Sequence, residues 1–306
     1  MNKRRLGKSD LFVSEMGLGC MSLGHDENKA KEIIHAALDH GVNYLDTADL
    51  YDFGINEEFV GKAVKSVRKD VIIATKVGNK WHEDHSGWSW DASKQYIKQA
   101  VKDSLSRLQT DYIDLYQLHG GTMEDNHEEV IDTFEELIKE GVIRYYGISS
   151  IRPNVISSFA SKTDLTSVMM QYSLLDRRPE EWMPLLKEHE ISIIARGPIA
   201  KGILSDRALT QKAQSVLQKG YLTYTYEQLT ELLSSLKEAF ASRPIEELAF
   251  QYVLSHEEVG AVIPGASSCE QVLKNIKAVQ SQKLSAEELQ LLRSLTTANK
   301  YEQHRI

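Results

Sequence analysis

Short apolar runs recur along the chain, and seven of them end at a polar, charged or glycine position. These positions are Asp46, Lys76, His119, Ser149, Gln171, Arg196 and Gly265. The segments between the runs have the apolar spacing of helices that cover a core on one side. The alternation predicts an α/β fold of the (β/α)8 TIM-barrel type, because the parallel strands of such a barrel all end at one mouth.

The alternation resolves into eight strand–helix pairs. We expect strands at residues 16–19, 42–46, 71–76, 112–119, 144–149, 168–171, 191–196 and 259–263. We expect the helices that follow them at residues 29–40, 57–65, 92–108, 127–139, 155–160 and 180–188, in a longer tract after the seventh strand, and at residues 269–279. Gly41, Gly141 and Gly260 each stand between a helix and the next strand, where the positive φ of a helix C-cap favours glycine.

Further elements lie at the two ends of this pattern. Residues 11–15 follow the turn-like segment 7–10 and predict the second arm of an N-terminal β-hairpin that plugs the barrel. An extra C-terminal helix, capped by Ser285 with Glu288, runs to about Leu295. Two irregular stretches, 77–90 and 205–225, belong to the catalytic face. We therefore expect residues 1–306 to form a single barrel domain.

Composition narrows the possible partners and location. With 36 Lys and Arg against 44 Asp and Glu, the net charge of −8 argues against nucleic acid and anionic membranes. The two cysteines have no zinc or redox spacing, which favours a reducing compartment. We find neither a signal peptide nor a run of about 20 apolar residues, so we expect a cytoplasmic protein with no membrane association. The lack of a heptad seam favours a monomer or a weak oligomer.

The predicted ends of two early strands, and the loop after one of them, bring a carboxylate, an ammonium group and a phenol together. Asp46 and Lys76 end strands that are neighbours in the predicted barrel, so we expect an ion pair between them. Tyr51 lies in the loop five residues after Asp46. An ammonium held near a tyrosine hydroxyl lowers the tyrosine pKa from about 10, which suits a proton donor. His119, one strand further round, is placed to donate a hydrogen bond to a substrate carbonyl.

Four segments closely resemble the signature segments of the aldo-keto reductases: residues 45–51, 74–78, 114–119 and 147–150. The likeness extends over nearly the whole chain, with the motifs in the family's order. The chain is similar to bacterial NADPH-dependent members and to members that serve as potassium-channel β-subunits. The resemblance implies a carbonyl reductase acting on a small-molecule carbonyl substrate by direct hydride transfer from NADPH. It further implies proton donation by Tyr51, tuning by Lys76 and Asp46, and carbonyl positioning by His119.

The same resemblance implies the residues that hold NADPH/NADP. Ser149 and Gln171 match positions that bond the nicotinamide carboxamide, and Ser150 stands where relatives commonly have asparagine. Gly265, Ser267, Gln271 and Asn275 match a segment that holds the adenosine phosphate end, next to a helix N-terminus. The full implied set is Gly19, Cys20, Met21, Asp46, Ser149, Ser150, Gln171, Arg196, Gly197, Pro198, Ile199, Ala200, Lys201, Gly202, Gly265, Ser267, Gln271, Lys274 and Asn275.

Arg196 departs from the family pattern, because relatives commonly place an aromatic ring at this position to stack on the nicotinamide. A planar guanidinium also stacks on rings. We hypothesise that Arg196 covers the nicotinamide and, being cationic, disfavours the positively charged oxidised cofactor.

Other functions remain open at this stage. One alternative is a hydrolase or isomerase on the same fold, since fold alone does not fix function. Another is a non-catalytic subunit that senses NADP(H). The run His82, Glu83, Asp84 and His85 has no supporting strand-end ligands, so we expect no metal site. Five large side chains near the mouth either line an aromatic substrate pocket or provide packing for a long loop: Trp81, Trp88 and Trp90, with Met21 and Phe53.

Overall fold

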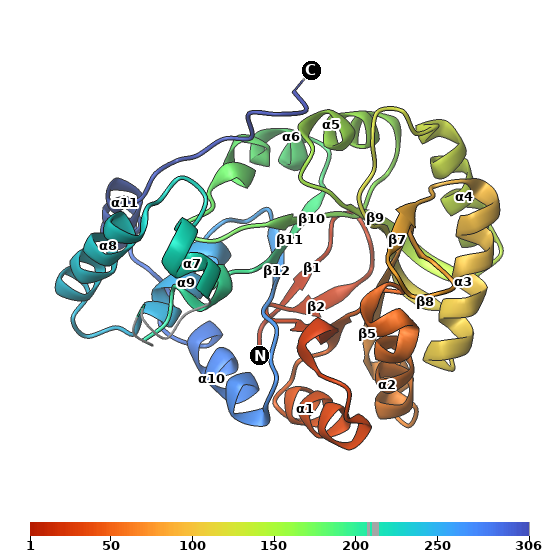
Figure 1. Ribbon diagram of the computed structural model, residues 1–306, viewed down its shortest axis with the longest axis horizontal. Coiled ribbons are helices and arrows are strands. Elements are labelled where there is room, and N and C mark those ends of the chain that lie inside the picture. The colour runs from red at the N-terminus through yellow and green to blue at the C-terminus, as the bar shows by residue number, and fades with distance from the viewer. Residues whose placement is uncertain (207–208, 210–213, 306) are drawn as a thin grey trace.

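The computed structural model describes residues 1–206, 209 and 214–305. Its main sheet has eight parallel strands in the order β12-β11-β10-β9-β8-β5-β4-β3. Bridges from Met16 to Val262 and from Gly19 to Gly265 join the two edge strands, which closes the sheet into the predicted barrel (Figure 1). The strands are β3 (Leu18–Gly19), β4 (Tyr44–Asp46), β5 (Ile72–Val77), β8 (Ile113–Leu118), β9 (Ile143–Ser149), β10 (Ser167–Gln171), β11 (Ser192–Arg196) and β12 (Val259–Ile263).

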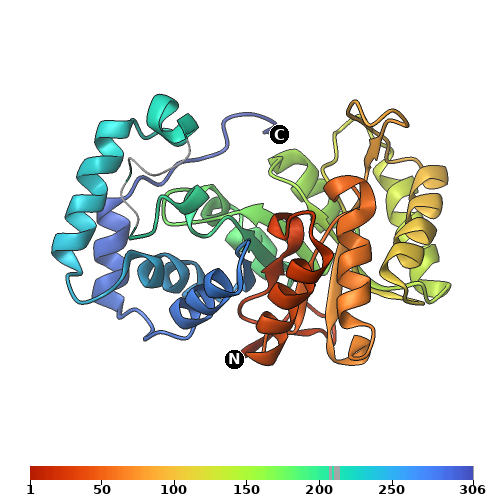
Figure 2. The ribbon, with the colours of Figure 1, turned by 60° about the horizontal axis from the view of Figure 1, so that its bottom comes forward.

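Helices surround the barrel, as Figures 1 and 2 show. They are α1 (Glu27–Asp39), α2 (Ile55–Val64), α3 (Lys94–Leu108), α4 (His127–Lys139), α5 (Pro153–Lys162), α6 (Met183–Glu188), α7 (Gln214–Lys219), α8 (Tyr226–Ala239), α9 (Ile245–Leu254), α10 (Cys269–Val279) and α11 (Ala286–Leu295). The extra C-terminal helix α11 begins at the predicted capping box of Ser285 and Glu288 and lies beside α8. In the described part of the chain, no helix combines the length and the apolar character needed to cross a bilayer.

The hydrophobic core has two parts. The larger part packs the outer face of the sheet against the helices, which is why the strand residues are buried on both sides. The smaller part fills the barrel interior and includes Leu6, Leu11 and Val13. These three residues belong to the N-terminal hairpin segment, whose strands are β1 (Lys3–Arg5) and β2 (Phe12–Ser14). The hairpin therefore plugs the barrel, as predicted.

Local details differ from the prediction at several positions. The first helix begins at Glu27 and not at residue 29, because the Asp26 side chain accepts hydrogen bonds from the N–H groups of Asn28 and Lys29. Gly41 and Gly141 have the expected positive φ of 86° and 76°. Gly260 is not a helix cap: it lies inside β12, where a Cβ would come within 2.4 Å of the Leu6 side chain. Glycine here lets the hairpin plug approach the strand.

The two stretches that the sequence left irregular contain regular elements. Residues 77–90 hold an antiparallel hairpin of β6 (Asn79–Trp81) and β7 (Trp88–Trp90), which we call the mouth hairpin. The stretch 205–225 contains α7, and its residues 207–208 and 210–213 lie outside the described residues. The longer tract after the seventh strand consists of α8 and α9.

Candidate active site

An ion pair lies at the barrel mouth between two neighbouring strands. Asp46 is the last residue of β4, and Lys76 is close to the end of β5. The Lys76 Nζ donates to both Asp46 carboxylate oxygens, at 2.7 and 2.5 Å, and to the Thr47 carbonyl at 2.6 Å. Both side chains are buried. The expected pairing is therefore present, and it fixes the ammonium in a site shielded from water.

Tyr51 and His119 complete the group. Tyr51 opens the short 3-10 turn Tyr51–Gly54, whose next residues Asp52 and Phe53 have left-handed φ angles of 49° and 53°. The Lys76 Nζ lies 5.1 Å from the centre of the Tyr51 ring. His119 directly follows β8, and its ring meets the Tyr51 ring edge to face with centroids 6.1 Å apart. The structure thus brings together all four residues that the sequence singled out.

The electrostatics of Tyr51 differ from the expectation in sign. Burial raises the pKa of Tyr51 above 10, and the positive charge of Lys76 only partly opposes this effect. The expectation of a net decrease is therefore wrong for this structure, and the Tyr51 hydroxyl is protonated at neutral pH. Burial by itself lowers the pKa of Lys76, but Asp46 and Tyr51 raise it above its ordinary value, so the ammonium stays charged.

The His119 ring is neutral at physiological pH. Burial, together with the charges of Lys76 and Arg196, lowers the pKa of His119 to about 3. Its Nδ1 is buried and has no hydrogen-bond partner among the described residues. A neutral imidazole keeps one N–H, so it can donate a hydrogen bond without adding a positive charge beside Lys76.

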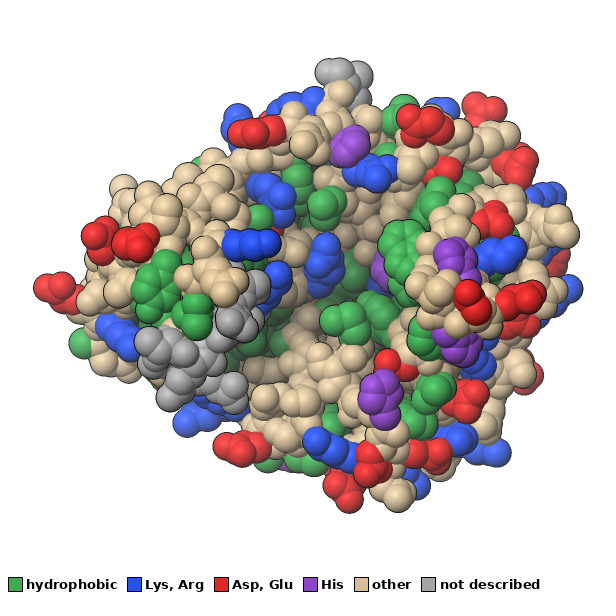
Figure 3. Space-filling view, in the orientation of Figure 1, with side chains coloured by type: hydrophobic (Ala, Val, Ile, Leu, Met, Phe, Trp, Pro, Cys, Tyr) green, Lys and Arg blue, Asp and Glu red, His purple; other side chains and the backbone are tan. Residues whose placement is uncertain are grey.

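A cavity of about 970 Å³ opens above these four residues. Figure 3 shows the hollow near the centre of the face that looks down the barrel, with basic side chains beside it. Most of the predicted cofactor residues line it: Gly19, Cys20, Met21, Asp46, Ser149, Ser150, Gln171, Arg196, Gly197, Pro198, Ile199, Lys201, Gly202 and Gly265. Such a volume suits a small organic ligand.

Comparison with known proteins places this geometry in a family. The model of the aldo/keto reductase family matches residues 15–297. The chain belongs to the aldo/keto reductase family. It is 56% identical over 305 residues to the uncharacterized oxidoreductase YqkF of Bacillus subtilis, with 100% of both chains covered.

A solved structure and a further relative add to this finding. The holo form of the aldo-keto reductase AKR11C1 from Bacillus halodurans superposes with a TM-score of 0.95 at 57% identity, covering 100% of both chains. The NADH-specific methylglyoxal reductase of Escherichia coli is 28% identical over 324 residues, covering 97% of this chain and 99% of that protein. Aldo-keto reductases use nicotinamide cofactors.

Five predicted cofactor residues of this aldo/keto reductase do not line the mouth cavity. Ala200 is fully buried in the core. Four lie in or just before α10: Ser267, Gln271, Lys274 and Asn275. The Ser267 amide and hydroxyl donate to the Gln271 side chain, and the Lys274 Nζ is 2.5 Å from Glu246. In this structure Ser267, Gln271 and Lys274 are bonded to protein groups, and none of the four residues lines the mouth cavity.

The cavity also has walls that the sequence analysis missed. Asn79, Arg152 and Tyr221 line it, from the mouth hairpin, the residue before α5 and the segment before α8. Arg152 lies two residues after Ser150, in the loop that follows a strand end. Because such loops form the barrel mouth, this position could have indicated that Arg152 lines the cavity. Of the large apolar residues expected near the mouth, Trp88, Trp90 and Met21 line this cavity. Trp81 and Phe53 do not: Phe53 stacks on His85 at 4.1 Å between ring centroids.

A second buried carboxylate, Asp49, lies two residues before Tyr51. Its side chain is 1% exposed. Burial, and then the charge of Glu57, raise the pKa of Asp49 to about 8, although Arg107 and Lys76 oppose the change. The Tyr96 hydroxyl also faces this carboxylate. Asp49 is therefore largely protonated at neutral pH, unlike an ordinary surface aspartate.

This raised pKa makes stability depend on pH. Below pH 4 Asp49 is protonated in both the folded and the unfolded chain, whereas above pH 8 it is ionised in both and its burial is unfavourable. We expect Asp49→Asn to increase the free energy of unfolding relative to wild type by about 1–3 kcal/mol at pH 9 and far less at pH 5. Urea unfolding at both pH values measures this. The exposed-site variant Glu32→Gln should show no such trend, and an equal gain at both pH values would contradict the assignment.

Proposed function

We propose that this protein reduces aldehydes or ketones to alcohols with NADPH and that Tyr51 donates the proton. The observation that carries the proposal is the buried Lys76 ammonium, bound to Asp46 and set against the Tyr51 ring beneath a large cavity. A dihydronicotinamide supplies the hydride when bound. The protein's own residues then have to hold the carbonyl compound, deliver a proton and exclude water.

Each of the four residues has a distinct part in this proposal. The neutral His119 ring donates a hydrogen bond to the carbonyl oxygen, which polarises the carbonyl and holds it near Tyr51. The Tyr51 hydroxyl transfers its proton to the same oxygen as negative charge develops there. Lys76 stabilises the resulting phenolate by its charge, and Asp46 keeps the ammonium in place. Asp46 acts through Lys76 and is a positioning residue.

The cavity supports a dinucleotide on grounds of charge and shape. Arg196 and Lys201 line it, and neither forms an ion pair with a carboxylate among the described residues. Gly197, Gly202 and Gly265 lie nearby and leave the backbone open to a ligand. The Lys201 ammonium fits an anionic pyrophosphate, whereas the Arg196 guanidinium suits the nicotinamide end of the cofactor. We propose NADPH over NADH, and the NADH-specific relative makes the comparison of both cofactors part of the test.

Turnover of 4-nitrobenzaldehyde, followed as loss of NADPH absorbance, tests the proposal. A carbonyl reductase consumes NADPH and produces 4-nitrobenzyl alcohol in equal amounts. A cofactor-sensing subunit would bind NADPH without consuming it, and a hydrolase or isomerase would not require it. NADPH consumption in equal amount to the alcohol supports the first function. Binding without turnover, across several aldehydes and ketones, would reject it in favour of the sensing role.

Arg196 gives a separate prediction about the redox state of the cofactor. Arg196 ends β11 and donates from Nη1 to the Gln171 side chain at 3.2 Å, so it is anchored at the cavity wall. If its guanidinium stacks on the nicotinamide, Arg196→Tyr should raise the affinity for NADP⁺ relative to NADPH by about 3- to 10-fold. Fluorescence titrations with both forms measure this ratio. Lys201→Met is the control, because loss of a phosphate contact should weaken both forms alike; an unchanged ratio in Arg196→Tyr would refute the stacking hypothesis.

A further inference from the structure

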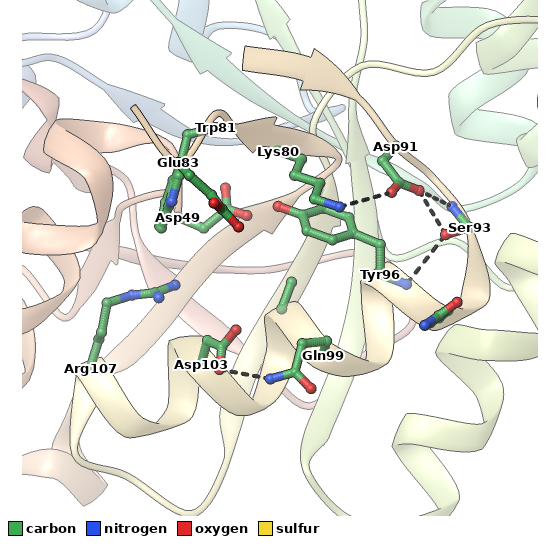
Figure 4. A pocket seen from close by; sticks show the side chains of 12 residues that line it. Asp49, Lys80, Trp81, Glu83, Asp91, Ser93, Tyr96, Gln99, Asp103 and Arg107 are labelled. Atoms are coloured by element: carbon green, nitrogen blue, oxygen red, sulfur yellow. Dashed lines mark hydrogen bonds and ion pairs between the residues drawn. The ribbon is translucent and has the colours of Figure 1, made fainter. Parts of the chain in front are cut away.

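A second cavity lies outside the barrel mouth, between the mouth hairpin and α3 (Figure 4). We call it the outer pocket. Its volume is about 410 Å³, and it shares no lining residue with the mouth cavity. Its walls come from the loop after β4, from β6 and the turn that follows, and from α3. The proposed reduction gives this pocket no role.

The outer pocket has an excess of negative charge. Its two basic side chains are already paired: the Arg107 Nε lies 2.7 Å from Glu57, and the Lys80 Nζ lies 3.9 Å from Asp91. Of the remaining acids, Glu83 and Asp103 form no ion pair with a described residue, and Asp49, which is also unpaired, is largely protonated at neutral pH. A ligand that enters this pocket therefore meets carboxylates whose charge is not balanced, which favours a cation.

Asp49 forms the deep end of the outer pocket. Neither of its carboxylate oxygens receives a hydrogen bond of ordinary geometry from a described residue, although the Leu50 amide and the Tyr96 hydroxyl face it. Figure 4 shows the carboxylate on the same side of the pocket as the Tyr96 hydroxyl. Ionising a carboxyl group in such a buried position is unfavourable, so Asp49 keeps its proton at neutral pH, and a ligand ammonium that displaces this proton would offset the penalty.

The aromatic walls also accept cations. The Arg107 guanidinium lies 5.3 Å from the centre of the Trp81 ring, and the Lys80 Nζ lies 5.4 Å from the centre of the Tyr96 ring. Both contacts are within the range of cation–π attraction. The pocket thus combines a deep carboxylate, rim carboxylates and indole and phenol rings, which together suit an alkyl chain that carries ammonium groups.

We propose that the outer pocket binds a linear di- or polyamine, with one ammonium group at Asp49 and another near Glu83 and Asp103. An ammonium has three N–H donors and can bond to the Asp49 carboxylate once it has displaced the Asp49 proton. The alkyl segment lies against the Trp81 and Tyr96 rings. A second ammonium at the rim explains why the exposed acids cluster at the opening. This site is independent of the proposed reduction, because no mouth residue contributes to it.

Isothermal titration calorimetry of the full chain with spermidine, at constant ionic strength, tests the proposal. We expect saturable binding at one site, and no binding of the uncharged 1,5-pentanediol. Asp49→Asn should weaken spermidine binding by at least about 10-fold, and Glu83→Gln by about 3-fold. Glu32→Gln removes an equal charge from the exposed face of α1 and should leave the affinity unchanged.

Several outcomes would overturn the site. One is the absence of saturable heat with spermidine; another is an equal loss of affinity in Glu32→Gln and Glu83→Gln, which would indicate binding by overall charge. Equal competition by MgCl2 at the same charge concentration would also reject it. If Asp49→Asn does not fold, the rim variant Glu83→Gln/Asp103→Asn keeps the test decisive, because both side chains are exposed. Circular dichroism checks that each variant is folded. The quantity compared between variants is the spermidine affinity, not NADPH turnover.

Discussion

Tyr51→Phe is expected to lower kcat for the NADPH-dependent reduction of 4-nitrobenzaldehyde by about 10³-fold. The substitution removes the hydroxyl of the ring that lies against both Lys76 and His119, and with it the proposed proton donor. The ring itself remains, which preserves the packing against His119. Steady-state kinetics with saturating NADPH measure the loss.

A matched control comes from the same cavity. Tyr221 also lines it, and its hydroxyl accepts a hydrogen bond from Gln171 at 2.8 Å, away from the ion pair. Tyr221→Phe should weaken NADPH binding and leave kcat within about 10-fold of wild type. Tyr51→Phe should keep its NADPH affinity. Comparable kcat values for Tyr51→Phe and wild type would show that the proton comes from another group.

Lys76→Met has a second large expected effect, on both turnover and stability. Lys76 is fully buried, and its removal leaves the Asp46 carboxylate without its partner in the barrel interior. Breaking a buried ion pair from one side costs about 3–5 kcal/mol of folding free energy. We expect urea unfolding to show a loss of this size, together with a loss of most activity.

The double variant Asp46→Asn/Lys76→Met separates the two effects. With both charges removed, most of the lost stability should return, because replacing both partners of a buried pair is often nearly neutral. Activity should not return, since no ammonium remains to stabilise the Tyr51 phenolate. Recovery of turnover in the stable double variant would show that Lys76 acts only through folding.

Much of the fold and of the mouth was predictable from strand ends. In a parallel barrel neighbouring strands end side by side, so the order of Asp46, Lys76 and His119 along the chain also gave their order around the mouth. Their positions relative to one another follow from strand register, which the apolar runs specify. The roles of these residues, and the assignment of residues 1–306 to a single domain, stay predictions.

Other features depend on burial and on tertiary packing, which the pattern of apolar and polar residues does not specify. The sign of the Tyr51 pKa shift is set by burial, and burial follows from how the whole mouth closes over the ring. The mouth hairpin was missed because its strands are only three residues long and polar residues separate them. Gly260 was wrongly predicted to be a helix C-cap. Glycine is needed at this position because the Leu6 side chain, from the other end of the chain, packs against it.

The mouth hairpin separates the mouth cavity from the outer pocket. Trp88, Trp90 and Asn79 line the mouth cavity, whereas Lys80 and Trp81 line the outer pocket. The same two strands bound both spaces, so a displacement of the mouth hairpin that widens the mouth cavity would alter the shape of the outer pocket. If an aldehyde bound in the mouth cavity displaces the mouth hairpin, the ligand affinity of the outer pocket will change, and by thermodynamic reciprocity a ligand in the outer pocket will change the affinity of the mouth cavity by the same factor.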